Sequence, residues 1–526
     1  MKRKKYTLEK VLVTGYAAEG KSLAKIDGKV IFIEGAVPGD VVDVFVSTNK
    51  KDWGEGKATH FHELSAERVQ PFCKHFGLCG GCKWQMLPYK KQLEYKQQEV
   101  AQNFRRIGKI DLPAMLPIVG ADETKYYRNK LEFTFSNKRY LTSEEIKSLP
   151  KPLQSRGLED SDNIIATYNI DQPKPGLTDN AINSQAPEVA PFEACPTSSF
   201  RQGVRETSSS AGGMEGALGF HVPRIFDKII DIHECFLMED VNNQIRNSIR
   251  DFAKENNYSF YDIKQHSGWL RNIIIRYCST GELMVNICLG YEDAAETKKL
   301  LDFLLSKVPS ISTLLYTINP KWNDTIYDLT PQVYYGKGYV MEQLEDFKFK
   351  IGPKSFFQTN TKQAENLYNI TRDFAGLTGN EIVYDLYCGT GSIGIFVSKL
   401  AKKIIGVEAI EEAIADAKEN AALNNITHAD FFAGDVIKIC NDDFFVQHGR
   451  PDVIITDPPR AGMHEKLVIK LLEIEAPKIV YVSCNTATQA RDLALLSEKY
   501  AVDKIQPVDM FPHTHHIECV VLLKLK

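Results

Sequence analysis

Residues 381–394 read EIVYDLYCGTGSIG, an apolar run that ends in a glycine-rich turn. Such a run is typical of a buried strand that leads into a helix. The alternation continues through KIIGVEAI (403–410), EEAIADAKENAALNN (411–425), ADFFAGDV (429–436), DVIITDPPR (452–460), KLVIKLLEI (466–474) and KIVYVSCN (478–485). Strands alternating with amphipathic helices predict an α/β fold with a doubly wound, Rossmann-like parallel sheet, which we place at 346–526.

The turn itself has the spacing of a nucleotide-binding loop. Gly389, Gly391 and Gly394 fit G-x-G-x-x-G, and Glu408 ends the following strand. Ligands of such sheets bind at the carboxyl ends of the strands, where glycines admit close backbone approach and a glutamate accepts bonds from ribose hydroxyls. A dinucleotide site of the dehydrogenase type shares this pattern.

Two further acids favour S-adenosylmethionine over a dinucleotide. Asp385 precedes the glycines, where a carboxylate attracts a sulfonium or an ammonium group and repels a pyrophosphate. Asp435 ends the next strand, where it could bond an adenine amine. The sequence therefore predicts a methyl donor at this edge of the sheet.

Two more strands end at the same edge. Asp457-Pro-Pro-Arg460 resembles the D/N-P-P motif of amino-methyltransferases, but an arginine replaces their aromatic residue and suits a phosphate or a carbonyl oxygen. Cys484 ends the fifth strand. A thiolate there could add to carbon 6 of uracil, making carbon 5 nucleophilic toward a methyl group.

That reaction needs a base to remove the proton from carbon 5. The tail FPHTHHIECVV (511–521) offers Glu518, His513, His515 and His516. We favour Glu518 because it directly precedes the last apolar strand.

The rest of the chain suggests two further domains. Short strands broken by glycines predict a small β-barrel at 1–62. Residues 63–345 predict a central α+β domain, whose helical part at about 88–118 could pack with the C-terminal domain. Residues 73–140 carry 13 Lys or Arg against 6 Asp or Glu among interleaved aromatics, which suits RNA contact. Residues 150–215 look like a low-complexity insertion.

Composition limits the function classes. The 526 residues have a net charge of −4, so RNA binding must come from local basic patches such as Arg105, Arg106, Lys125, Arg128, Lys130, Lys138 and Arg139. No apolar run has the length of a membrane span, and the basic start lacks the apolar region of a signal peptide. We therefore expect a cytoplasmic protein whose 11 cysteines are thiols, metal ligands or catalysts.

Taken together, DLYCGTG (385–391), GVE (406–408), DPPRAG (457–462), VSCN (482–485) and HHIECVVLL (515–523) resemble the RNA 5-methyluridine methyltransferases, which modify uracil in 23S rRNA and tRNA. PKSFFQTN (353–360) and YRNKLEFTFSNKRY (127–140) belong to the resemblance, and 1–62 resembles a TRAM domain, an OB-like barrel. Only the insertion falls outside it.

The resemblance assigns roles residue by residue. It implies Gln358, Tyr387, Glu408 and Asp457 as contacts of the methyl donor, Cys484 as nucleophile and Glu518 as base. Ser392 stands at a position that contacts the donor in parts of the family. Thr486 replaces the proline that usually follows VSCN.

Cys73, Cys79 and Cys82 have the spacing of metal ligands, and the fourth ligand must come from elsewhere. The resemblance points to Cys235 and to a [4Fe–4S] cluster, with Zn as the alternative that four thiolates also suit.

Other functions stay open from sequence alone. An RNA cytosine-5 methyltransferase would need a second cysteine within DPPR, which is absent. A dehydrogenase and a non-catalytic RNA-binding protein are the alternatives outside the class. By resemblance, the barrel and the cysteines favour 23S rRNA over tRNA as partner, and we expect a monomer without membrane contact.

Overall fold

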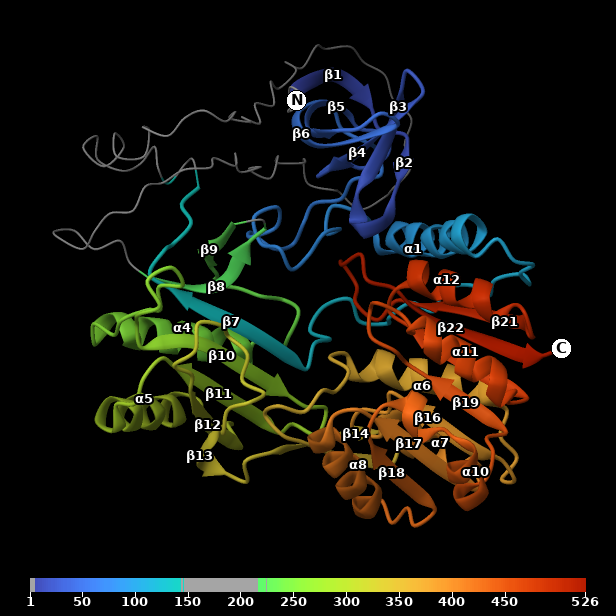
Figure 1. Cartoon of the computed structure of the whole chain (residues 1–526). Coiled ribbons are helices and arrows are strands. Elements are labelled where there is room, and N and C mark those ends of the chain that lie inside the picture. Colours follow the sequence, from blue (N-terminus) through green and yellow to red (C-terminus); the bar gives the residue numbers. More distant parts are fainter. Residues whose placement is uncertain (1–4, 143–144, 146–215, 224) are drawn as a thin grey trace, which may run out of the picture. The chain divides into compact units, whose positions relative to one another are not determined.

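The computed structural model describes residues 5–142, 145, 216–223 and 225–526, so the predicted insertion at 150–215 lies outside the described residues. The chain forms two compact units. The N-terminal unit comprises residues up to Pro88 with the described residues of 140–145 and 222–223. The large unit comprises Tyr89–Arg139, 216–221 and Ile225–Lys526 (Figure 1).

The N-terminal unit contains a six-stranded sheet in the order β1-β5-β6-β4-β3-β2. Its strands are β1 (Tyr6–Leu12), β2 (Gly15–Tyr16), β3 (Ser22–Ile26), β4 (Lys29–Glu34), β5 (Val41–Asn49) and β6 (Trp53–Glu63), and Ala18–Gly20 forms a 3₁₀ turn. Val42, Val44 and Val46 alternate inward along β5 into one core. The predicted strands are therefore present, whereas the identity of this sheet as a TRAM barrel stays a prediction.

The central sheet of the large unit has the order β13-β12-β11-β10-β7-β8-β9. Its strands are β7 (Lys130–Ser136), β8 (Ala217–Val222), β9 (Ile225–Asp231), β10 (Leu270–Tyr277), β11 (Leu283–Leu289), β12 (Thr313–Ile318) and β13 (Gln332–Gly336). Helices α4 (Val241–Glu255) and α5 (Ala294–Lys307) pack on each other through the stacked rings of Phe252 and Phe303. The guanidinium of Arg246 in α4 lies over Phe133 of β7, so α4 covers one face of the sheet.

The third sheet carries the predicted doubly wound domain. Its order is β18-β17-β16-β19-β20-β22-β21, with β16 to β20 parallel and β22 antiparallel to both neighbours. The strands are β16 (Ile382–Leu386), β17 (Lys403–Glu408), β18 (Ala429–Ala433), β19 (Val453–Thr456), β20 (Lys478–Ser483), β21 (Tyr500–Val508) and β22 (Glu518–Leu525). Because the chain runs outward in both directions from β16 and β19, the crevice at their carboxyl ends is where such folds bind ligands.

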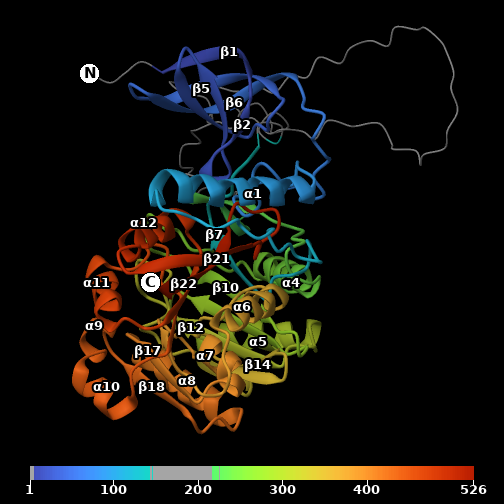
Figure 2. The same ribbon diagram turned by 90° about the vertical axis from the view of Figure 1, so that its right-hand side faces the viewer.

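Helices cover both faces of this sheet. They are α1 (Tyr89–Asn103), α6 (Thr361–Ala375), α7 (Ser392–Val397), α8 (Glu411–Leu423), α9 (Val436–Ile439), α10 (Asp442–His448), α11 (Glu465–Ile474) and α12 (Thr486–Leu496), with a π turn at Phe104–Gly108 and a 3₁₀ turn at Ser398–Leu400. The hairpin of β14 (Val340–Leu344) and β15 (Phe347–Ile351) joins α6, α7 and α8 in one core, while the other core contains α1 and α9 to α12. Figure 2 shows α1 beside α12 and β21.

No helix in the described residues is long and apolar enough to cross a membrane.

Candidate active site

The glycine-rich turn connects β16 to α7 and adopts a backbone that only glycine supports easily. Gly389 and Gly391 have φ values of 53° and 74°, and Tyr387 shares the left-handed region at 62°. A Cβ on Gly394 would lie 3.0 Å from Asp385 Oδ2, so a larger residue would press on that carboxylate. The turn therefore brings backbone close to the strand ends, as predicted for a ligand loop.

Asp385, the acid before the glycines, is 1% exposed. Its Oδ2 accepts a hydrogen bond from the Gly394 backbone at 2.8 Å, whereas Oδ1 has no partner among the described residues. Burial, with the nearby charges of Asp457 and Glu408, raises the pKa of Asp385 to about 7. A carboxylate left in this state fits a cationic ligand, whose charge would offset the cost of burial.

Acids also follow the neighbouring strands. Glu408 at the end of β17 accepts hydrogen bonds from the backbone of Gly389 at 3.3 Å and Ile410 at 3.1 Å. Asp435, after β18, caps α9 by accepting from the Ile437 backbone. Both sit at the strand edge expected for ribose and adenine contacts.

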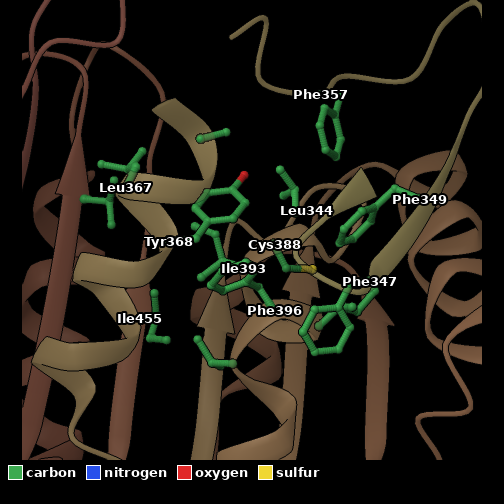
Figure 3. Packing of buried hydrophobic residues seen from close by; sticks show 14 of the residues in the cluster. Leu344, Phe347, Phe349, Phe357, Leu367, Tyr368, Cys388, Ile393, Phe396 and Ile455 are labelled. Atoms are coloured by element: carbon green, nitrogen blue, oxygen red, sulfur yellow. The ribbon is translucent and has the colours of Figure 1, made fainter. Parts of the chain in front are cut away.

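A buried tyrosine that the sequence did not reveal lies beside the first residue of α7. The Tyr368 hydroxyl on α6 lies 2.9 Å from Ser392 Oγ, at the first residue of α7. Figure 3 shows Tyr368 with Ile393 and Phe396 of α7 in the apolar packing beneath that hydroxyl. Gln358 lies on the segment between β15 and α6, where its backbone carbonyl accepts from Asn129 Nδ2 at 3.0 Å.

Strand register brings the predicted nucleophile and base together. Ser483 of β20 pairs with Cys519 of β22, and the strands are antiparallel. Continuing that register by one residue sets Cys484 opposite Glu518. Two residues separated by 34 positions thus meet at one edge of the sheet.

The electrostatics of this pair are those of a buried acidic site. Burial raises the pKa of the Cys484 thiol to about 11, with Glu518 and Asp457 adding to the rise and Arg460 opposing it. Glu518 is 6% exposed, and burial followed by the Asp457 charge raises its pKa well above the usual value. Burial also raises the pKa of Asp457 to about 7. The free protein therefore holds the Cys484 thiol protonated at pH 7, and burial disfavours the charged form of Glu518.

Arg460 is fixed beside this pair. Its backbone carbonyl accepts from Asn485 Nδ2 at 3.0 Å and Thr488 Oγ1 at 3.3 Å, and Asn485 also caps α12. The Arg460 guanidinium lies 3.2 Å from His516 Nδ1. Burial, with the charges of His515 and Arg460, lowers the pKa of His516 to about 3, so its ring is neutral.

Helix α1 holds the tail segment that leads into Glu518. Lys96 Nζ donates to Asp509 Oδ1 at 2.6 Å and to the Phe511 carbonyl at 3.2 Å, and both side chains of the ion pair are fully buried. Gln92 Oε1 accepts from the His513 backbone at 2.9 Å. The segment from Asp509 to His513 is thus pinned to a helix more than 400 positions earlier in the chain. No local pattern in the sequence indicates this contact, because Gln92 and Lys96 are polar.

The predicted metal ligands fall in different parts of the fold. Cys73, Cys79 and Cys82 are half-buried in the N-terminal unit, and Cys235 is buried in the large unit. No group of three or more His, Cys, Asp or Glu side chains within the described ranges is placed to hold a metal ion. The predicted cluster therefore stays a prediction.

Comparisons with known proteins identify the family. The profile of the family described as tRNA (Uracil-5-)-methyltransferase matches residues 330–526. A protein of Bacteroides thetaiotaomicron described as an uncharacterized RNA methyltransferase is 50% identical over 97% of this chain and 100% of its own length. A Porphyromonas gingivalis protein of the same description is 45% identical over 97% of this chain and 98% of its own length.

A solved structure shares the fold. The tRNA (uracil-54, C5)-methyltransferase of Pyrococcus abyssi, in complex with S-adenosyl-L-homocysteine, superimposes with a TM-score of 0.66 at 24% identity, covering 98% of this chain and 100% of that one. The chain therefore belongs to the S-adenosylmethionine-dependent RNA 5-methyluridine methyltransferase family and is an RNA methyltransferase.

Proposed function

We propose that this enzyme methylates carbon 5 of a uridine in 23S rRNA through a covalent adduct with Cys484. The observation that carries the proposal is the register that sets Cys484 opposite Glu518, near the charge of Asp457, in the sheet whose strand β16 leads into the glycine turn. A nucleophile and a base at one strand edge are what carbon methylation of uracil requires.

The proposed chemistry uses each residue once per turnover. The Cys484 thiol first loses its proton to solvent, and the resulting thiolate adds to carbon 6. The electron pair of the carbon 5–carbon 6 double bond then makes carbon 5 nucleophilic. S-adenosylmethionine supplies a methyl cation equivalent to carbon 5 and leaves as the neutral thioether. Glu518, as carboxylate, then takes the proton from carbon 5, and the Cys484 thiolate is expelled as the double bond re-forms.

The methyl donor would lie on the acidic rim. We assign its cationic groups to Asp385 and Asp457, its ribose to Glu408 and its adenine to Asp435, with Gln358, Tyr387, Gly389 and Ser392 as the remaining contacts. The support is electrostatic, since the pKa values of the buried Asp385 and the half-buried Asp457 rise to about 7 in the free protein. A sulfonium would let both ionise.

The choice of 23S rRNA rests on the cysteines and the N-terminal sheet, which resemble the rRNA branch of the family. The named structural neighbour acts on tRNA, so tRNA is the second candidate. We also propose a [4Fe–4S] cluster on Cys73, Cys79, Cys82 and Cys235, with Zn as the alternative. Iron analysis and absorption spectra of anaerobically purified protein would decide between them, and an active protein free of both metals would refute the cluster.

Mass-spectrometric mapping of 5-methyluridine tests the function. RNA would be compared from cells that carry the wild-type protein, no protein, Cys484→Ala or the control Cys440→Ala, which alters a buried cysteine outside the candidate site. We expect one or more rRNA sites to lose the mark without the protein and with Cys484→Ala only. A mark lost from tRNA instead would reassign the substrate, and an unchanged map would refute the proposal.

A further inference from the structure

Two exposed rings stack on each other at one end of the strands of the central sheet. Trp322 and His266 have centroids 4.6 Å apart and planes only 8° from parallel. Trp322 is 74% exposed. His266 lies in the turn before β10 and Trp322 in the loop after β12. Exposing an indole to this extent forgoes the burial that usually stabilises tryptophan, so the pair calls for an explanation beyond folding.

The loop that carries Trp322 is held rigidly from below. Arg271 of β10 is 1% exposed, and its guanidinium donates to the backbone carbonyls of Asn319 at 2.6 Å and Asn323 at 2.9 Å. It also bonds the Lys321 carbonyl and the Asp324 carboxylate. A buried arginine thus fixes the residues on both sides of an exposed tryptophan.

The turn that carries His266 is equally constrained. The Asp262 carboxylate accepts from the backbone of Lys264 at 2.8 Å and Gln265 at 3.1 Å. His266 itself has a φ of 53°, a conformation that costs energy outside glycine. The Tyr261 ring lies 3.9 Å from the Arg271 guanidinium, which ties this turn to the Trp322 loop. Both rings are therefore presented in a fixed arrangement.

The surroundings of the pair are cationic. Lys264 Nζ lies 5.9 Å from the ring of Phe226, which is 63% exposed. Lys138 and Lys228 lie near Lys264. Burial lowers the pKa of Lys228, and the charges of Lys264 and Lys138 lower it further. Asp227 and Asp262 pair with Lys264 and Lys138. Among the described residues around the rings, five cations outnumber four acids by one: Lys138, Lys228, Lys264, Arg271 and Lys321 against Asp227, Asp262, Asp324 and Asp328.

We propose that Phe226, Lys264, His266 and Trp322 form a stacking platform for a single-stranded segment of the RNA substrate outside the target uridine. An unpaired base would stack on the free face of Trp322, and Lys264 would contact the backbone. Rigid aromatic faces beside cations are how proteins hold unpaired nucleotides without reading their sequence. The positive charge favours RNA over a protein partner. This inference rests on the proposed function for the identity of the substrate.

The test measures binding and turnover separately. Fluorescence anisotropy with a labelled single-stranded RNA would give Kd for wild type, Trp322→Ala, Trp322→Leu and Trp322→Phe. We expect Ala and Leu each to raise Kd about tenfold and Phe to raise it by less than about threefold, because only the ring stacks. The control is Tyr335→Ala, which removes a 51%-exposed ring of β13. Tyr335 pairs with Leu314 near the start of β12, away from Trp322, so this change should leave Kd unchanged.

Methylation assays with rRNA from cells lacking the protein give the second readout. Trp322→Ala should raise KM about tenfold and leave kcat unchanged. The fluorescence of RNA carrying 2-aminopurine should be quenched on binding to wild type and Trp322→Phe, but not on binding to Trp322→Ala or Trp322→Leu. A purely structural role for Trp322 would not produce this pattern.

The outcomes separate the two proposals. If wild type methylates RNA and Trp322→Leu binds as tightly as wild type, the platform is wrong and the function stands. If wild type methylates no uridine, the function fails, while the Kd series still decides the platform. A variant that binds free RNA normally but fails on ribosomal particles would show a protein partner and would also overturn the platform.

Discussion

Two buried aspartates of the large unit differ in how many hydrogen-bond partners their carboxylates have. Asp509 is fully buried, and its oxygens accept from Lys96 Nζ at 2.6 Å, Tyr89 Oη at 2.9 Å and the Phe511 backbone at 3.1 Å. Asp385 is almost as buried but accepts from the Gly394 backbone through one oxygen, while the other has no partner among the described residues. One carboxylate is satisfied by the fold, and the other is not.

The difference separates scaffold from site. Burying an uncompensated charge costs free energy. An acid paired with a buried cation therefore stabilises the fold. An acid without such a partner can be stabilised by a bound cationic ligand instead. Asp457 and Glu518 resemble Asp385 in this respect, because burial raises the pKa of all three acids. The contrast predicts that substitutions of Asp385, Asp457 and Glu518 change chemistry and binding, whereas substitutions at Lys96 and Asp509 change stability.

Among the substitutions that test this contrast, Glu518→Gln should have the largest effect, and the effect should be on turnover. The amide keeps the shape of the side chain but cannot take the proton from carbon 5, so we expect turnover to fall about 10³- to 10⁴-fold. An RNA–protein adduct should accumulate on denaturing gels, and the double variant Cys484→Ala/Glu518→Gln should form none. Near-normal turnover would shift the role of base elsewhere, and His516→Gln would then test the neutral imidazole beside Arg460.

Lys96→Met should break the scaffold side of the comparison. Removing one partner of a buried ion pair leaves the other charge unpaired, so we expect about 3 kcal/mol less free energy of unfolding in urea. Lys90→Met changes an exposed lysine of the same helix and should cost less than about 0.5 kcal/mol. Adding Asp509→Asn to Lys96→Met should cost less than the sum of the single changes. Strict additivity would argue against a coupled pair.

The sequence predicted which residues of the candidate site lie at strand ends. Asp385, Glu408, Cys484 and Glu518 each follow or begin an apolar run, and parallel strands bring such positions to one edge. The structure brings Cys484 and Glu518 into register, as that argument expects. Local hydrophobic pattern was sufficient because these residues are positioned by the strands on which they lie.

Partners that meet across long separations left no local pattern. The buried stripe of α1 consists of Gln92, Lys96 and Val100, so polarity concealed the face that packs. Tyr368 lies on α6, a helix that was not predicted, and it meets Ser392 only in the folded chain. Arg271 supports carbonyls some 50 positions later. Such contacts depend on tertiary packing, which composition and periodicity do not encode.

Asp385→Asn should sharpen the ligand side of the comparison with a smaller effect. Neutralising the carboxylate removes its attraction for a cationic donor, so we expect Kd for S-adenosylmethionine to rise about 30-fold in calorimetry. Unlike Lys96→Met, this change should leave urea stability unchanged or raise it, because the unpaired acid no longer needs to be buried. Asp442→Asn, at an exposed acid of α10, is the matched control. Equal Kd values for both variants would remove Asp385 from the donor site.

The pH dependence of donor binding should show the smallest effect and the clearest sign. Asp385 and Asp457 have pKa values of about 7 in the free protein, and a bound sulfonium would lower both. Binding then releases protons, so affinity is highest above pH 7 and falls as pH drops through 7, by at most about tenfold per pH unit for each proton released. S-adenosylhomocysteine lacks the sulfonium charge and should show a weaker dependence between pH 6 and 8, measured by calorimetry in buffers of different ionisation enthalpy. Identical slopes for the two ligands would mean that these acids do not sense the sulfonium, and the unpartnered Oδ1 of Asp385 would then need another ligand to explain it.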